Sequence, residues 1–365
     1  MIAVFAYAFA HRKTQDFLLE IAAAGHRDVT VIGAPFQKLK HAGDTTSYWG
    51  NTARRARAHD TSALCARLGF EFVELAHSDV DAIADLARER ALKLGIISGA
   101  RILKRGVIEA FEQGIVNFHP GKIPETSGLD AFFYTLKNNV DAGVTTHFVD
   151  PRVDAGDFLA FDAVQLGADD SAEAVQENGY QLQILALRRF LNDWSAGTLA
   201  PSPIDRPSKN EPMTPAQKWE VVQHFRRWRA ARYMAQCADR LHSACKAGQT
   251  DAALTLLDAH PTLLEQTTEQ GWTPLILAVF GQHSDLAQAL LERGANPNAM
   301  GRKGTTALMY AKTALMEQSP PDLSLLDLLI AHGGDASRTD CFGKTVAAYV
   351  QNDPILLAYF QKHGA

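Results

Sequence analysis

The chain has 365 residues, which is more than one hydrophobic core usually supports, so we expect two or three domains. Hydrophobic residues make up 46% and charged residues 21%, a balance that is typical of a globular protein and excludes a largely disordered chain. The net charge of −5 argues against a nucleic acid as partner, because the surface as a whole does not attract phosphates.

Short apolar runs alternate with helical patterns from residue 1 to about residue 165. This alternation predicts an α/β domain with a mostly parallel, Rossmann-like sheet and helices on both faces. Active sites of such sheets lie at the carboxyl ends of the strands. The expected strands are 2–8, 28–33, 71–75, 94–98, 114–118, 144–149 and 157–162. The expected helices are 14–24, 61–68, 78–92, 104–113, 129–138 and about 171–194.

The second part of the chain has a different pattern. Several prolines among serine and glycine predict a linker after residue 194, and a helix is expected at about 215–236. Beyond it, Gly271–Ala278 recurs as Gly304–Ala311 with an offset of 33 residues. We therefore expect three regions: a catalytic domain at 1–194, a linker with a connecting helix at 195–239, and an all-α repeat domain at 240–365.

The repeated segment resembles ankyrin repeats, which have a period of 33 residues and the pattern T-P-L-x-x-A. Such repeats form binding surfaces and do not identify a reaction. The resemblance implies a domain that binds a protein partner or a second small ligand. The sequence does not define the oligomeric state, and a homodimer stays one alternative.

Two polar residues, separated by one apolar residue, lie at and just beyond the carboxyl end of the expected strand 114–118. Asn117 and His119 are two residues apart, so they project to the same side of an extended segment. Asp154 follows the next expected strand and offers a carboxylate to the same rim. Acyl transfer to an amine needs such a set, because a proton must leave the amine and an oxyanion must be stabilised.

Four motifs in one order resemble the formyltetrahydrofolate-dependent formyltransferases. They are N-x-H-P at Asn117–Pro120, a proline-glycine loop at Pro124–Gly128, G-x-T-x-H-x-V at Gly143–Val149, and D-x-G at Asp154–Gly156. The resemblance implies the formyltransferase fold and N10-formyltetrahydrofolate as the formyl donor. It also implies that Asn117, His119 and Asp154 are the catalytic residues and that His147 supports them.

The same resemblance implies where folate binds. Backbone and apolar side chains of a loop after the expected strand 94–98 would hold the pterin, and the loop from Asp150 would complete the slot. The residues are Ser98, Gly99, Arg101, Ile102, Leu103 and Asp150.

Two loops are candidates for acceptor binding. The loop Pro120–Gly128 departs from the usual family pattern, and its candidates are Lys122, Thr126 and Ser127. The other candidates, His11, Arg12 and Lys13, precede a helix that Thr14 could cap. The alternative for these three residues is a solvated loop without a role in binding.

Arginines beside Trp228 are either a nucleotide diphosphate site or the solvated face of a helix.

An acceptor is implied by the resemblance as well. Family members with an ankyrin extension are similar to nucleotide-sugar N-formyltransferases of polysaccharide biosynthesis, so a nucleotide-linked amino-deoxy sugar is the expected small-molecule amine. Another small amine and formyltetrahydrofolate hydrolysis stay open. An alternative of a different class is an ankyrin-mediated binding protein with an inactive transferase domain. Methionyl-tRNA is disfavoured, because a repeat domain stands where that subfamily binds nucleic acid.

Cysteine usage and the amino terminus indicate the compartment. The four cysteines form no C-x-x-C pair, so the pattern indicates no disulfide framework and no metal site. The apolar run at residues 1–5 is too short for a signal peptide or a membrane span. We therefore expect a cytoplasmic protein that does not bind a membrane.

Overall fold

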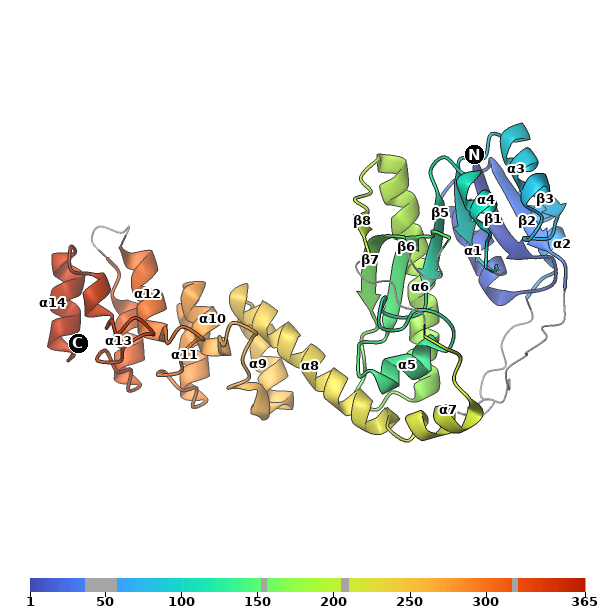
Figure 1. Cartoon of the computed structure of the whole chain (residues 1–365). Helices are drawn as coiled ribbons and strands as arrows, with labels where there is room; N and C mark the ends of the chain where they lie inside the picture. Colours follow the sequence, from blue (N-terminus) through green and yellow to red (C-terminus); the bar gives the residue numbers. More distant parts are fainter. Residues whose placement is uncertain (37–57, 101, 152–155, 205–209, 317–320, 365) are drawn as a thin grey trace. The chain divides into compact units, whose positions relative to one another are not determined.

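The computed structural model of the chain describes residues 1–36, 58–100, 102–151, 156–204, 210–316 and 321–364 (Figure 1). The chain divides into two units, Met1–Tyr233 and Met234–Ala365. The boundary falls inside one helix, α8 (Phe225–Lys246). Across the described residues, no helix combines the length and the apolar character that a membrane span needs.

The first unit is built on a sheet whose described strands follow the order β3-β2-β1-β4-β5-β6-β7-β8. Strands β3 to β5 pair in parallel, whereas β5 to β8 pair antiparallel. The predicted α/β fold with a mostly parallel sheet is confirmed, with an antiparallel edge added. The strands are β1 Ile2–Tyr7, β2 Val29–Ala34, β3 Glu71–Glu74, β4 Leu94–Ile97, β5 Ile115–His119, β6 Gly143–Phe148, β7 Asp157–Ala163 and β8 Ser202–Pro203.

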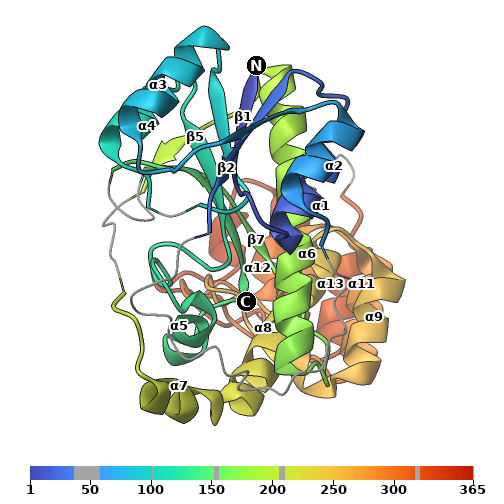
Figure 2. The same ribbon diagram turned by 90° about the vertical axis from the view of Figure 1, so that its right-hand side faces the viewer.

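Alternate residues of each parallel strand enter two different cores, because successive side chains of a strand point to opposite faces. In β1, Val4 packs in one hydrophobic cluster and Phe5 in the other. Figure 2 shows helices on both sides of the strands. The cluster of Val4 is covered by α1 (Arg12–Ala23), α2 (Thr61–Leu68) and α6 (Ala172–Ala196), and that of Phe5 by α3 (Val80–Glu89) and α4 (Arg105–Glu109).

The stretch predicted as a linker packs on the first unit wherever the structure describes it. Strand β8 pairs with β7, and Asn210 forms a bridge with Gly128. The single helix expected at 215–236 is in fact two, α7 (Pro215–Val222) and α8. The break lets Val221 and Trp228 bury together against α5 (Ala131–Lys137).

The second unit consists of helix pairs that the repeated sequence explains. Thr273 and Thr306 are buried, and each caps a helix by accepting from a backbone N–H three residues later. The repeat therefore marks a helix start. The helices are α9 Thr250–Ala259, α10 Pro274–Phe280, α11 Ser284–Glu292, α12 Ala307–Leu315, α13 Ser324–Ala331 and α14 Pro354–Lys362, with short 3₁₀ turns at Pro261–Leu263 and Ala347–Tyr349.

Phe118 anchors the strand that carries the candidate site. Its ring is fully buried, with centroids 5.5 Å from Phe17 and 6.1 Å from Phe190. We expect Phe118→Ala to lower the free energy of unfolding by about 3–5 kcal/mol, because a large cavity remains. Urea denaturation measures this loss. Leu185→Ala is the control, since Leu185 is 53% exposed on α6, and an equal loss in both variants would contradict the prediction.

Candidate active site

Strand β5 presents Asn117 and His119 at its carboxyl end. Val116 and Phe118 face the cluster covered by α1 and α6. Because side chains alternate along a strand, Asn117 and His119 project from the opposite face. The predicted pairing of the two side chains on one face is therefore present in the structure.

Asn117 is held by its cross-strand neighbour His147. The two residues are directly opposite in the β5–β6 ladder, and 3.3 Å separates Asn117 Nδ2 from His147 Nε2. His147 Nδ1–H donates to the Phe148 carbonyl at 3.0 Å, so the neutral ring accepts at Nε2. One N–H of the Asn117 amide is thus engaged, and the same nitrogen carries a second N–H. His147 is completely buried, which fits a supporting role.

His119 has a defined tautomer in its neutral form. The ring is 4% exposed, and Nε2–H donates to the Thr126 carbonyl at 2.9 Å. A carbonyl can only accept, so the lone pair of the neutral imidazole is on Nδ1. The nitrogen that can accept a proton in a reaction is therefore Nδ1.

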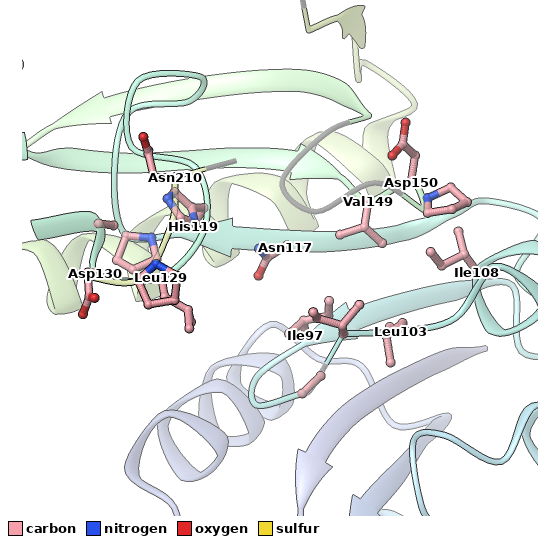
Figure 3. Close-up of a pocket in the computed structure, with 17 residues that line it drawn as sticks. Ile97, Leu103, Ile108, Asn117, His119, Leu129, Asp130, Val149, Asp150 and Asn210 are labelled. Atoms are coloured by element: carbon pink, nitrogen blue, oxygen red, sulfur yellow. The ribbon is translucent and has the colours of Figure 1, made fainter. Parts of the chain in front are cut away.

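A pocket of about 500 Å³ lies beside both residues. Figure 3 shows Asn117 between His119 at one end and Val149, Ile108 and Leu103 at the other. The lining is polar near His119 and mostly apolar beyond Asn117. The pocket is lined by Ile97, Ala100, Ile102, Leu103, Ile108, Asn117, His119, Pro120, Gly128, Leu129, Asp130, Ala131, Val149, Asp150, Pro151, Asn210 and Pro212.

The predicted folate-binding residues divide into two groups. Ile102, Leu103 and Asp150 line the pocket. Ser98 and Gly99 instead face β1, because the Ser98 hydroxyl and both backbone N–H groups donate to the Phe5 carbonyl. Arg101 and the predicted catalytic Asp154 lie outside the described residues.

The loop after His119 uses its own side chains for support. Thr126 and Ser127 were expected to bind the acceptor, but both are fully buried. Their hydroxyls donate to the carbonyls of Lys122 and Pro124, so they hold the loop in shape. The Lys122 ammonium lies 5.6 Å from the centroid of the Phe161 ring on β7. None of these three side chains is in the pocket lining given above.

The loop after β1 is ordered by contacts within the protein. His11, rather than Thr14, is the N-cap of α1, since its Nδ1 accepts from the Thr14 backbone N–H. Burial, and then the charge of Lys13, lower the pKa of His11. Arg12 donates two hydrogen bonds to Glu177, at 2.8 and 2.5 Å, and stacks on the Tyr180 ring. These side chains are therefore not part of a loose solvated loop.

Lys13 is in the first turn of α1, and its Nζ lies 3.4 Å from the Phe118 carbonyl of β5. Burial lowers its pKa from 10.5 to about 7. The unfolded chain then binds one more proton than the folded chain between pH about 7 and 10.5, so the free energy of unfolding of the wild type rises with pH there. The slope from this group is at most about 1.4 kcal/mol per pH unit.

We expect Lys13→Met to lose this dependence and to be more stable than the wild type below pH 7. Denaturation midpoints measured between pH 6 and pH 10 compare the free energies of unfolding of the wild type and Lys13→Met. The linkage relation gives the expected order of magnitude of the difference. Lys137→Met, at an exposed position on α5, should keep the wild-type rise with pH. A parallel pH dependence in wild type and Lys13→Met would refute the shift.

The arginine cluster around Trp228 is not a nucleotide site of the expected kind. The indole is 3% exposed and donates to the Val140 carbonyl at 2.9 Å, so its face cannot stack on a base. Arg229 donates to the Asp170 carbonyl and Arg232 to the Asn139 carbonyl. The helix instead packs Trp228 into a core cluster, and these two arginines hold neighbouring backbone, so the expected solvated face is present only in part.

Several pocket residues were missed from sequence. Ile97 could have been found, because it alternates with the core residue Ile96 at a strand end. Asn210 and Pro212 come from the proline-rich segment and carry no periodic signal. Asp130 also lines the pocket, and its carboxylate accepts from the Met213 N–H and pairs with Lys218 at 2.6 Å.

Comparison with known proteins finds a family match for each of two parts of the chain. Residues 46–189 match the family described as formyl transferase, and this range includes Asn117, His119, His147 and Asp154. The chain contains a formyl transferase domain. Residues 241–340 match the family described as ankyrin repeats in three copies, so the predicted repeat type is confirmed.

Proteins similar to the formyl transferase domain include formyltransferases that are named for two different acceptors. A phosphoribosylglycinamide formyltransferase of Bacillus subtilis (strain 168) is 28% identical over 104 residues, which are 28% of this chain and 53% of the relative. A methionyl-tRNA formyltransferase of Geobacter sulfurreducens is 26% identical over 121 residues, 33% of this chain and 37% of the relative. The chain thus spans about half or less of these two relatives.

A solved structure is also similar to this chain. The crystal structure of phosphoribosylglycinamide formyltransferase from Streptococcus pneumoniae TIGR4 is 22% identical, with a TM-score of 0.40. The similarity covers 53% of this chain and 98% of that chain.

Proposed function

We propose that this protein is an N-formyltransferase that moves the formyl group of N10-formyltetrahydrofolate to a primary amine of a small molecule. The observation that carries the proposal is the placement of Asn117 and His119 on one face of β5, at the side of a pocket. The formyl transferase domain includes both residues, which supports the same reaction.

The two side chains suit the two demands of the reaction. As the amine nitrogen bonds to the formyl carbon, negative charge develops on the formyl oxygen, and an N–H of the Asn117 amide can donate to it. The attacking amine loses a proton, which His119 can accept at Nδ1. Collapse of the tetrahedral intermediate breaks the bond between the formyl carbon and N10. N10 takes up the proton that His119 accepted, so neutral tetrahydrofolate leaves as the other product and His119 returns to its neutral form.

The apolar part of the pocket is the proposed site of the donor. A pterin is a flat ring system, and the side chains of Ile97, Leu103 and Val149 offer it an apolar slot beyond Asn117. A donor bound there would place its formyl group toward Asn117 and His119. The role of Asp154 stays a prediction: a carboxylate near the imidazolium would stabilise the charge that His119 gains.

For the acceptor we propose a nucleotide-linked amino-deoxy sugar. The support is the combination of a formyl transferase domain with ankyrin repeats in one chain. A net charge of −5 does not favour tRNA. The ankyrin unit is proposed to bind a protein partner or a second small ligand, and formation of a homodimer stays a prediction.

A panel of amines tests the acceptor. Purified protein is incubated with N10-formyltetrahydrofolate and with dTDP- and GDP-linked amino sugars, glycinamide ribonucleotide or methionyl-tRNA, and the products are weighed by mass spectrometry. We expect a sugar nucleotide that is heavier by one formyl substituent. Formylation of glycinamide ribonucleotide or of methionyl-tRNA alone would reject a sugar nucleotide as the acceptor. It would still support formyl transfer as the reaction. Release of formate without any amine product would indicate hydrolysis.

A further inference from the structure

Three consecutive backbone carbonyls of the loop after His119 accept hydrogen bonds from side chains that lie outside this loop. The Glu125 carbonyl accepts from Asn138 Nδ2 at 2.7 Å and from Asn210 Nδ2 at 3.1 Å. The Ser127 carbonyl accepts from Asn210 Nδ2 at 3.0 Å and from the Asn210 backbone N–H at 3.1 Å. Asn210 therefore spans the loop on both sides of Thr126.

The carbonyl between these two is the one that His119 uses. The Thr126 carbonyl accepts from His119 Nε2 at 2.9 Å, and this bond fixes the lone pair of the neutral ring on Nδ1. Thr126 is fully buried, and both its backbone N–H and its hydroxyl donate to the Lys122 carbonyl. The position of this carbonyl thus depends on the shape of the whole short loop.

We infer that Asn210 is a positioning residue for His119, acting through the carbonyls of Glu125 and Ser127 that flank Thr126. This inference rests on the proposed function, in which His119 is the base. Figure 3 shows Asn210 beside His119 at the polar end of the pocket. Asn210 lies outside residues 46–189, so a segment beyond the matched domain completes the catalytic geometry.

The bonding pattern favours positioning over direct ligand contact. Each of the two carbonyls lies within hydrogen-bond distance of Asn210 Nδ2, so the two N–H groups of the amide are directed at the loop. A side-chain amide with both N–H groups bonded to a loop holds that loop in place. A small displacement of a catalytic base lowers the reaction rate strongly. Loss of Asn210 should therefore lower kcat while the KM for the folate donor stays nearly constant.

The matched variants are Asn210→Asp and Asn138→Asp. Aspartate has the shape of asparagine but lacks its N–H donors, so Asn210→Asp removes both side-chain bonds to the loop. Asn138→Asp removes one bond to the Glu125 carbonyl and leaves the bonds to Ser127 intact. Asn210→Ser is the second test variant, because it removes the same donors without adding a charge.

Two readouts decide the inference. NMR of isotope-labelled imidazole nitrogens, assigned to His119 with a His119→Ala sample, reports which nitrogen carries the proton at neutral pH. We expect Nε2–H in the wild type and in Asn138→Asp, and a mixture of both tautomers in the two Asn210 variants. We also expect kcat to fall about tenfold or more in the Asn210 variants, with the KM for the donor changed by less than about twofold.

The contradicting result is a His119 spectrum with the wild-type tautomer in both Asn210 variants. A large rise in the KM for the donor at constant kcat would also overturn the inference, because it would make Asn210 a ligand-binding residue. The NMR measurement needs no turnover. Absence of formyl transfer in the wild type would therefore reject the proposed function while the tautomer still decides whether Asn210 positions His119.

Discussion

Replacing His119 with alanine is expected to lower kcat by about two to four orders of magnitude, the usual contribution of a positioned general base. The structure gives the reason, since the buried ring has one nitrogen tied to the Thr126 carbonyl and its lone pair on the other. The affinity for the folate donor should change little. Steady-state kinetics with varied donor and acceptor separate the two effects.

Rescue by free imidazole sharpens this test. His119→Ala leaves a cavity of about the size of the missing ring beside the pocket, so added imidazole should restore part of the lost turnover. His224→Ala is the control, because His224 is exposed near the break between α7 and α8. Full activity of His119→Ala would exclude His119 as the base, whatever the effect of imidazole.

Asn117→Asp is expected to lower kcat by about two to three orders of magnitude, which is typical of losing one oxyanion donor. The aspartate would keep the shape of the side chain but place a negative charge where negative charge develops. It would also lose the contact with His147 Nε2 at 3.3 Å. Single-turnover measurements at saturating donor isolate this effect from binding.

Asn192→Asp provides the same chemical change on the exposed face of α6 and should leave turnover unchanged. A loss confined to donor affinity in Asn117→Asp would show that the amide binds the donor and does not stabilise the transition state.

The parallel core of the fold could be predicted because each strand is a short apolar run with turn residues at its ends. The edge could not. Strand β8 has two residues and exists only through its pairing with β7. The break between α7 and α8 has no glycine or proline to announce it, and packing of Val221 and Trp228 on α5 determines it.

The site shows the same division between local and tertiary information. Asn117 and His119 could be predicted, because a spacing of two on a strand determines a shared face. The bonds of Thr126 and Ser127 to the loop backbone could not be predicted, since the sequence of a loop does not tell whether its hydroxyls face a ligand or its own backbone. Asn210 could not be found at all, because only the folded chain brings it to the loop Pro124–Gly128.

The measurement that tests the central claim most directly follows the formyl carbon. The wild-type protein is incubated with N10-formyltetrahydrofolate that carries an isotopic label in the formyl group, together with an accepted amine. We predict that the label appears on the amine nitrogen, with one tetrahydrofolate released for each formylated product, and that His119→Ala and Asn117→Asp slow both together. Label found only in formate, or an acceptor formylated at the same rate without Asn117 and His119, would contradict the account.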